Sequence, residues 1–239
     1  MTDLTIADAP AGAGSIPKCD SPSTAEAFEG LIPDEFKSLV RNIFGVRRGP
    51  IRYTRGQTIV VEGDASEYIY LVISGVVRSR KSFQDGTRSI LAFYLPTEFF
   101  GLTDRPTHLL SVEAVADANI LFFKRSALAS MAEHDTRIAN FLMTTTLAEL
   151  LRSQEHSLRI SKDAKSRVAS FLIEISKRMQ TQSCLDLPMS HGDIADHLGI
   201  TIETVSRVIT QMEDERLIAR GPYRSLMLRD RRALARLAK

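Results

Sequence analysis

Cysteines and long apolar runs are both scarce in this chain. Its 239 residues include two cysteines, Cys19 and Cys184, which lie far apart and form no cluster. This usage argues against a disulfide scaffold and favours a reducing compartment. No apolar run is long enough to span a bilayer, and the first residues lack the charged and apolar regions of a signal peptide. We therefore expect a cytoplasmic protein with no membrane partner.

Common enzyme signatures are also missing, and the overall charge is small. The chain has no Gly-x-Ser-x-Gly, P-loop or Cys-x-x-Cys motif, so we expect no enzyme and no catalytic residue. A formal net charge of +2 means that any nucleic-acid surface must be local. The C-terminal stretch is locally basic, with Asp230 as its one acid against Arg216, Arg220, Arg224, Arg229, Arg231, Arg232, Arg236 and Lys239.

The sequence character changes along the chain and indicates four parts. Residues 1–24 are rich in Ala, Gly, Ser, Pro and Asp, which predicts a disordered tail. Residues 25–125 contain mostly β-type sequence, and we expect them to form a sensor domain. Residues 126–160 have a helical pattern. Residues 161–239 contain a helix, a short strand, two helices around a turn and a hairpin.

The β-type part follows a predicted helix at Phe28–Phe44 and alternates short strands with turns. Thr58–Val61 and Tyr68–Ile73 are rich in β-branched and aromatic residues. Asp85-Gly86 is the strongest hairpin signal in the chain. Short strands at this spacing predict a sandwich or a barrel.

The helical pattern over residues 126–160 predicts one long helix. No Gly or Pro interrupts it, and such a helix is too long to lie wholly against a small barrel. We expect its apolar residues to pair two copies of the chain through Ile138, Phe141, Leu142, Leu147, Leu150, Leu151 and Leu158. Thr145 and Glu149 interrupt the cleanest heptad, so an intramolecular core helix is the alternative.

The segment from Leu187 to Ile209 carries the clearest pattern, two short helices around a tight turn. Gly199 supplies the turn, because a positive φ carries no Cβ penalty in glycine. Thr201 is a suitable N-cap for the second helix. The inner positions of both helices are apolar, namely Ile194, Ala195, Leu198, Val205, Val208 and Ile209. This pattern is typical of a DNA-binding helix-turn-helix, whose second helix enters the major groove.

The outward side of the second helix offers groups that can read bases. Glu203, Ser206 and Arg207 lie near its N-terminal end. Arginine can bind the two acceptors on a guanine edge, and glutamate can accept from the amino group of cytosine. The alternative is an ion pair between Glu203 and Arg207, which would contribute only about 0.2–0.5 kcal/mol. Both can hold, because the pair would also aim the arginine.

A β-barrel, a long helix and a C-terminal winged helix-turn-helix together resemble the cyclic AMP receptor/Fnr superfamily of bacterial transcription regulators. The resemblance covers the chain from about Phe28 to its end. It implies an α+β fold with an N-terminal double-stranded β-helix (jelly-roll) barrel, a long dimerisation helix and a winged helix-turn-helix. It rests on Gly56-Gln57-Thr58-Ile59-Val60 with Glu62-Gly63-Asp64, on Tyr70-Leu71-Val72-Ile73-Ser74-Gly75-Val76-Val77, and on Glu203-Thr204-Val205-Ser206-Arg207.

In that superfamily, the Glu-x-x-Ser-Arg pattern marks the Fnr/FixK branch, whose targets are palindromes resembling TTGAT–N4–ATCAA. The resemblance implies that Glu203, Ser206 and Arg207 read bases, with Ile202 against a thymine methyl group. It implies three partners, which are double-stranded DNA, RNA polymerase and a second copy of the chain. We expect contacts with the DNA backbone from Thr201, Thr204, Arg220, Arg224 and His191.

Two departures from the superfamily narrow the choice of effector. Cyclic nucleotide binders hold the phosphate with an arginine, but the matching place here reads His108-Leu109, with Arg105 nearby. Oxygen-sensing Fnr proteins hold an iron–sulfur cluster on four cysteines, and this chain has too few. We therefore expect no metal and no cofactor, as in FixK-type regulators, which activate genes for microaerobic respiration and nitrogen fixation.

Other interpretations stay open at this point. An unidentified small molecule in the barrel would make the chain a ligand-gated regulator of the same fold. A cupin-type metalloenzyme would need several histidines, and the β region contains only His108. Cys184, before the helix-turn-helix, is a candidate redox control point or else a buried inert residue. Solvent exposure is the expectation for His134, His156, His191 and His197.

Overall fold

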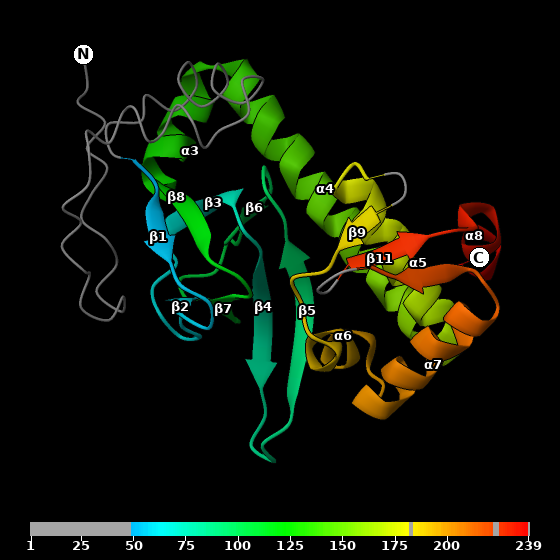
Figure 1. Ribbon diagram of the computed structural model, residues 1–239. Coiled ribbons are helices and arrows are strands. Elements are labelled where there is room, and N and C mark those ends of the chain that lie inside the picture. Colours follow the sequence, from blue (N-terminus) through cyan, green and yellow to red (C-terminus); the bar gives the residue numbers. More distant parts are fainter. Residues whose placement is uncertain (1–48, 182–183, 222–224, 239) are drawn as a thin grey trace. The chain divides into compact units, whose positions relative to one another are not determined.

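The computed structural model describes residues 49–181, 184–221 and 225–238 (Figure 1). The predicted tail at 1–24 and the predicted helix at Phe28–Phe44 lie outside these ranges. The chain divides into two compact units. The first contains residues 49–81 and 93–149, and the second contains residues 82–92 and the described residues from 150 onward.

Two antiparallel four-stranded sheets make up the β part of the described chain, in the orders β1-β8-β3-β6 and β2-β7-β4-β5. In chain order, the strands are β1 (Ile51–Tyr53), β2 (Thr58–Val60), β3 (Tyr68–Ser74), β4 (Val77–Ser82), β5 (Arg88–Tyr94), β6 (Phe99–Phe100), β7 (Ser111–Ala114) and β8 (Ala118–Lys124). In both sheets, strands distant in the sequence are neighbours, as in a jelly roll of two packed sheets. The predicted N-terminal jelly-roll fold is confirmed.

The strand β3 is buried along almost its whole length, and its alternating side chains serve both faces of its sheet. On one face, the ring of Tyr70 stacks on Phe100 with their centroids 4.8 Å apart. The other face contributes to a cluster of buried apolar residues, which are Ile69, Leu71, Ile73, Phe99, Leu121, Phe123 and Leu128. A strand that is buried on both faces needs a continuous apolar run, which explains the sequence of this segment.

Two turns in the β part depend on glycine. Gly75 separates β3 from β4 at φ 78°, and a Cβ there would lie 2.2 Å from the carbonyl oxygen of Asp117. Only glycine fits so close an approach. Asp85 and Gly86 form the turn between β4 and β5, with Gly86 at φ 83°. The hairpin predicted from Asp85-Gly86 is therefore confirmed.

The sheet that contains β4 and β7 carries a compact cluster of charges. Glu113 of β7 pairs with Arg78 of β4, and Glu113 Oε2 lies 2.9 Å from Arg78 Nη2. Arg80 binds the other carboxylate oxygen. Burial by itself raises the pKa of Glu113, but hydrogen bonds from Arg80 and Arg78 outweigh it and hold that pKa below its usual value. These three charged side chains therefore bind one another within the β part of the chain.

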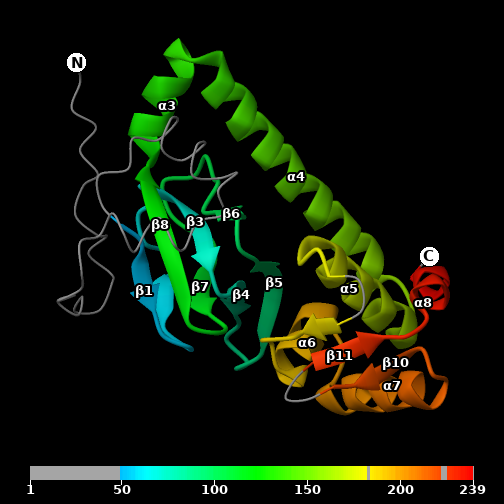
Figure 2. The ribbon, with the colours of Figure 1, turned by 45° about the horizontal axis from the view of Figure 1, so that its top comes forward.

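The stretch predicted as one helix forms two, α3 (Arg125–His134) and α4 (Thr136–Ile160), so the prediction of a continuous helix is wrong (Figure 2). Asp135 separates them with an extended backbone at φ −131°. Its carboxylate accepts the backbone N–H of Arg137 at 2.9 Å, a capping role that aspartate favours over a helix interior. No helix in the described part of the chain has the length and apolarity needed to cross a membrane.

Beyond α4, the described part of the second unit contains helices around a three-stranded antiparallel sheet of order β10-β11-β9. The elements are α5 (Ala164–Arg178), β9 (Cys184–Asp186), α6 (His191–Leu198), α7 (Ile202–Asp214), β10 (Ile218–Arg220), β11 (Ser225–Leu228) and α8 (Arg231–Leu237). The central helix α5 packs against α7 and α8 and buries Phe171 and Leu172. This order of elements confirms the predicted helix-turn-helix followed by a hairpin.

Candidate nucleic-acid interface

Local sequence signals build the sharp turn between α6 and α7. Ser190 and Asp193 form a capping box, in which the Ser190 hydroxyl accepts the Asp193 N–H and Asp193 accepts the Ser190 N–H at 3.0 Å. Gly199 ends α6 in the left-handed region at φ 62°. Thr201 then caps α7 by accepting the backbone N–H of Thr204 at 3.2 Å. The predicted glycine turn and threonine cap are confirmed.

The inner sides of α6 and α7 pack against each other and the rest of the unit. Ala195, at the contact, is only 3 % exposed, which fits the need for a small residue where helices approach. All of the predicted inner residues are buried, namely Ile194, Ala195, Leu198, Val205, Val208 and Ile209. Because one side of α7 is buried, its opposite side is fixed as the outer surface.

The outer side of α7 presents charged and apolar groups near its N-terminus. Glu203 and Arg207 are exposed, Ser206 is partly buried, and 47 % of Ile202 is exposed. Glu203 and Arg207 form no ion pair with each other, so the alternative suggested by their spacing is wrong. Hydrogen bonds from its own backbone N–H and from the Thr201 hydroxyl lower the pKa of Glu203. Glu203 is therefore an ionised acceptor at neutral pH.

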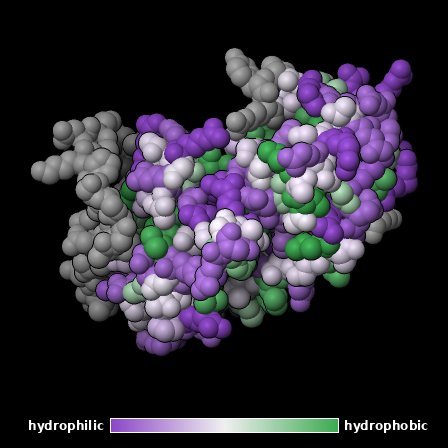
Figure 3. Space-filling model, turned by 90° about the horizontal axis from the view of Figure 1, so that it is seen from below, coloured by the Kyte–Doolittle hydropathy of each residue, from purple (hydrophilic) through white to green (hydrophobic). Residues whose placement is uncertain are grey.

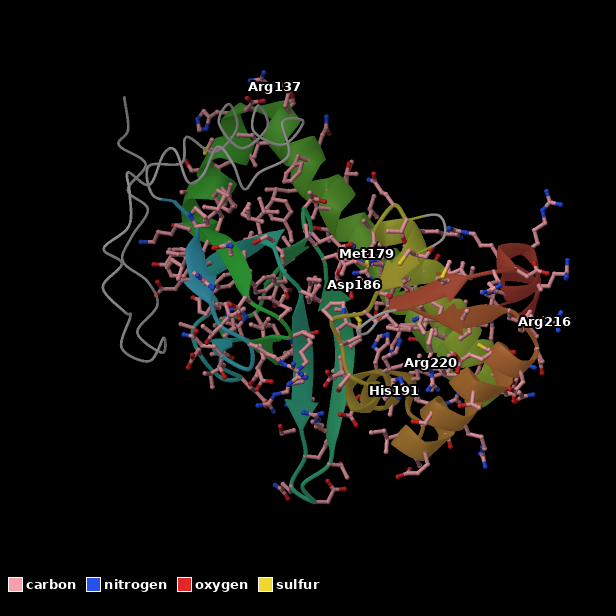
Figure 4. The ribbon with its side chains drawn as sticks, in the orientation of Figure 1. Arg137, Met179, Asp186, His191, Arg216 and Arg220 are labelled. Atoms are coloured by element: carbon pink, nitrogen blue, oxygen red, sulfur yellow. The ribbon has the colours of Figure 1, made fainter. Side chains whose placement is uncertain are left out.

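The residues predicted to contact the DNA backbone fall into two groups. Thr201 and Thr204 engage each other, because their hydroxyl oxygens lie 3.1 Å apart. His191 and Arg220 are exposed and line a groove of about 370 Å³ between the start of α6, α7 and the β10–β11 hairpin (Figure 4). Arg224 lies outside the described residues. Contacts of these residues with DNA stay predictions.

Specific contacts hold the two groove residues in place. Arg220 Nε lies 2.9 Å from Glu213 Oε2, and Arg220 Nη2 lies 3.3 Å from Thr210 Oγ1. His191 Nδ1 lies 3.1 Å from Ser206 Oγ. The contact between His191 and Ser206 did not emerge from the sequence, because helical spacing relates only residues on the same helix.

A stripe of exposed apolar residues runs along α4. Its members are spaced by three, four or seven residues, which places them on one side of the helix. Each is at least half exposed, namely Met143 (57 %), Leu147 (50 %), Leu150 (51 %), Leu151 (59 %) and Leu158 (67 %). Met143 is not among the residues predicted for dimerisation, although its spacing of four residues from Leu147 indicates it.

Two residues predicted for dimerisation do not belong to this stripe, so their assignment is wrong. Ile138 is only 2 % exposed. Phe141 packs edge-to-face on Phe99 of the β part, with ring centroids 5.2 Å apart. Phe141 therefore packs within the first unit, and Ile138 is too buried to contact a second copy. Leu142, which was also predicted for dimerisation, is partly buried, so its role stays a prediction.

The exposures of Cys184 and of two histidines follow the predictions. Cys184 is an exposed free thiol on β9, opposite Met227 of β11, so the alternative of a buried inert cysteine is wrong. His134 and His191 are exposed, as expected. The redox role of Cys184 therefore stays a prediction.

His197 is buried, which contradicts the expectation that it is exposed. Its ring stacks on His156 with centroids 4.3 Å apart and lies 5.7 Å from the ring of Phe171. Burial, followed by the neighbouring His156, lowers the pKa of His197 to about 3. His156 is partly buried, and burial followed by Arg159 lowers its pKa. These two neutral rings therefore belong to the packing of the second unit.

Three further features of the molecule bear on the alternative functions. Hydrophilic residues predominate on the face shown in Figure 3, where hydrophobic residues form only small patches. In the described ranges, no three His, Cys, Asp or Glu side chains gather as a metal ion would require. His108, where an arginine would hold a cyclic phosphate, is buried, and burial lowers its pKa. A neutral ring thus occupies that place.

Comparisons with known proteins give this arrangement a family. A model described as the Crp-like helix-turn-helix domain matches residues 166–237, and one described as the cyclic nucleotide-binding domain matches residues 50–135. The chain is 38 % identical to the nitrogen fixation regulation protein FixK of Azorhizobium caulinodans over 97 % of this chain and 95 % of the relative. It is 29 % identical to the transcriptional activator protein FnrL of Cereibacter sphaeroides over 74 % and 75 % of the two chains.

A solved structure gives the same result. FixK2 from Bradyrhizobium japonicum superposes with a TM-score of 0.76 and 38 % identity, over 80 % of this chain and 96 % of that one. Such coverage includes both the β part and the helix-turn-helix segment. The chain therefore belongs to the FixK group of the Crp/Fnr superfamily of DNA-binding transcription regulators.

Proposed function

We propose that the protein is a homodimeric transcription activator that binds palindromes resembling TTGAT–N4–ATCAA without an effector. The observation that carries this proposal is the capped helix α7, whose Glu203 and Arg207 are exposed and not paired with each other. Its FixK relative is named a nitrogen fixation regulation protein. We extend that role to this chain and place its targets at promoters of microaerobic, anaerobic or nitrogen-fixation genes.

Base reading is assigned to four side chains of α7. Arg207 binds the O6 and N7 acceptors of guanine, and Glu203 accepts from the amino group of a cytosine. Ile202 contacts a thymine methyl group, and Ser206 supplies a further hydrogen bond. A guanidinium that is not already bound to a neighbouring carboxylate can place both of its donors on one base.

The DNA backbone is held by a second set of groups. Arg220 and His191 lie beside α7 and supply donors to phosphates. Thr201, which caps α7, and Thr204, whose backbone N–H it binds, contact phosphates at the helix N-terminus. We assign Arg224 to the same role. These contacts orient the helix but do not select a sequence.

Dimerisation is assigned to the exposed stripe on α4. Met143, Leu147, Leu150 and Leu151 together present apolar side chains at helical spacing, and burying them against a second copy removes them from water. Pairing sets the two α7 helices about 34 Å apart, one turn of the duplex. A dimer then covers both halves of the palindrome.

This proposal defines the remaining roles of the chain. Residues 25–125 act as a barrel domain, residues 126–160 bring two copies together, and residues 161–239 bind DNA. Surface loops contact RNA polymerase in the cytoplasm, and the chain performs no enzymatic reaction. The neutral, buried His108 in place of an arginine supports control without a cyclic nucleotide.

Cys184 is assigned a control role. Its exposed thiol can be oxidised by peroxide to a sulfinate, and the added negative charge would repel nearby DNA phosphates. Replacing Cys184 by Ser is expected to slow the loss of DNA binding in peroxide. Equal rates of loss in the two proteins would contradict this role.

Fluorescence anisotropy tests the proposal directly. The purified protein is titrated onto a TTGAT–N4–ATCAA duplex and onto a scrambled duplex of the same composition, without effector, in air and in reductant. Tight binding to the palindrome alone supports the proposal. Weak binding to both duplexes would contradict effector-independent activity and favour the alternative of a ligand-gated regulator of the same fold.

A further inference from the structure

A contact between the two helices of the helix-turn-helix reaches one of the base-reading side chains. His191 is the first residue of α6, and its Nδ1 lies 3.1 Å from Oγ of Ser206 on α7. The helices also meet closely at this end, because a Cβ added at Gly192 would lie 3.8 Å from Ile202 Cδ1. The ring of His191 is therefore held beside the hydroxyl group of Ser206.

The direction of this hydrogen bond decides what Ser206 can offer to DNA. When the neutral ring carries its proton on Nε2, the Ser206 hydroxyl donates to Nδ1, and only oxygen lone pairs face outward. Those lone pairs accept from the amino group of adenine or cytosine. When His191 is protonated, Nδ1–H donates to Oγ, and the hydroxyl proton is free to point outward. Ser206 can then donate to the O6 or N7 of guanine or the O4 of thymine.

We infer that His191 is a positioning residue that sets the hydrogen-bond polarity of Ser206 and so makes the preferred base at one half-site position depend on pH. The inference rests on the proposed function, because it needs Ser206 to face a base pair. Histidine is suited to this role, since the ordinary imidazole changes charge near neutral pH.

Charged groups on β10, α6 and α7 share this part of the second unit with His191. On β10, Arg220 lines the same groove, and its charge is paired with Glu213. On α6, Asp193 is held in the capping box with Ser190. On α7, Glu203 and Arg207 lie on the turn that contains Ser206. DNA phosphates approaching the groove add negative charge, which favours the protonated ring.

This role differs from a simple phosphate contact. A histidine that only binds phosphate weakens or strengthens every sequence equally as it titrates. A histidine that sets the polarity of Ser206 changes the ratio of affinities between duplexes that differ at one position. The ratio is therefore the quantity to measure.

The experiment measures DNA affinity by fluorescence anisotropy at about pH 6 and about pH 8. The duplexes are variants of the palindrome in which one half-site position, changed symmetrically, carries each of the four base pairs in turn. The proteins are the unaltered chain, His191→Asn, Ser206→Ala and the control His134→Asn. Asparagine can bond to Ser206 but does not titrate. His134 is an exposed histidine of α3, outside the second unit. His191→Gln replaces His191→Asn if circular dichroism shows that the asparagine variant is misfolded.

The position read by Ser206 is the one at which Ser206→Ala loses its base preference. There, we expect the affinity ratio of the unaltered protein to change about three- to tenfold between the two pH values, the range of one neutral hydrogen bond. His134→Asn should behave in the same way. His191→Asn and Ser206→Ala should show no change of ratio.

Three results would overturn the inference and leave the proposed recognition of the palindrome standing. They are a ratio that does not depend on pH, the same pH dependence in His191→Asn, and no position that responds to Ser206→Ala. In each case, the unaltered protein would still select the palindrome. If the unaltered protein does not distinguish the palindrome from a scrambled duplex, the proposed function fails and the inference fails with it.

Discussion

The barrel and the helix α7 use the same kinds of charged side chain in opposite ways. In the β part, Glu113 is clamped between Arg78 and Arg80, and all three side chains are largely buried. On α7, Glu203 and Arg207 are close enough in sequence to pair but stay apart and exposed. Charges that neutralise each other hold a structure together, whereas charges left open can bind a partner. The difference separates the framework from the DNA-reading surface.

Apolar residues along α4 show the same contrast. Ile138 is buried and Phe141 packs into the first unit, whereas Leu147 and Leu151 are exposed on later turns of the same helix. The enclosed pair should contribute to folding, and the open pair to assembly. Each of the following substitutions should therefore affect either the stability of the fold or the binding of a partner, and leave the other unchanged.

The largest effect is expected from Arg207→Ala. Loss of a bidentate contact with guanine costs about 1–3 kcal/mol per half-site, so a dimer should lose about 2–6 kcal/mol of binding free energy on the palindrome. Anisotropy titrations measure this loss. The free energy of unfolding should stay within about 0.5 kcal/mol of the unaltered value, as for other surface substitutions. Arg137→Ala, at an exposed arginine of α4, is the matched control and should leave DNA affinity unchanged.

Disrupting the stripe on α4 should be nearly as severe for DNA binding. In Leu147→Glu/Leu151→Glu, two charges would be buried in the proposed dimer contact, so the chain should sediment as a monomer. Affinity for the palindrome should then fall on the order of a thousandfold, toward non-specific binding. Leu109→Glu, at another exposed leucine, should remain dimeric. A dimer that persists in the double variant would show that a different surface pairs the chains.

Removing the enclosed carboxylate should instead affect folding. Glu113→Gln leaves two largely buried guanidinium groups without their counter-charge, which should lower the free energy of unfolding by about 3 kcal/mol. Urea denaturation followed by circular dichroism measures it. Glu62→Gln is the matched control, because its pair with Lys81 is more exposed and should contribute less than about 1 kcal/mol. DNA affinity of the folded Glu113→Gln protein should be normal, and a large loss there would show that these enclosed charges also serve DNA binding.

The smallest effect concerns the two classes of histidine and depends on pH. The pKa of buried His197 is about 3, below that of a histidine in the unfolded chain. The unfolded state therefore binds the proton more readily, so stability is complete above about pH 6.5 and falls as pH drops toward about 3. Between pH 7 and pH 5, the loss should be about 2 kcal/mol.

Denaturation curves at the two pH values, followed by circular dichroism, measure this loss. His197→Asn should flatten the dependence on pH, whatever its effect on stability at neutral pH. His134→Asn, at an exposed histidine, should keep the full dependence. A pH dependence that is the same in all three proteins would show that His197 is not the group responsible.

Local signals made the helix-turn-helix predictable. Gly199 and Thr201 each favour one backbone role, and the apolar positions of α6 and α7 follow helical spacing, so the turn, the cap and the outer side of α7 could be placed from the sequence. The hairpin at Asp85-Gly86 could be placed for the same reason. These features depend on residues close together in the chain.

The sequence-based predictions were wrong where contacts between distant parts of the chain decide whether a residue is buried. Phe141 has the spacing of a dimer residue, but it contacts Phe99, which is remote in the sequence. His197 is buried because His156 and Phe171, on two other helices, enclose it. The break at Asp135 was missed because no Gly or Pro marks it, and aspartate can occupy either a helix or its cap.

Replacing the guanine of each half-site by 7-deazaguanine tests whether Arg207 reads that base. This analogue lacks the N7 acceptor but pairs normally with cytosine. Anisotropy should show that the unaltered protein loses about tenfold in affinity on the substituted palindrome, whereas Arg207→Ala binds both duplexes equally. Equal losses in both proteins would contradict the role of Arg207, because another group would then read the guanine.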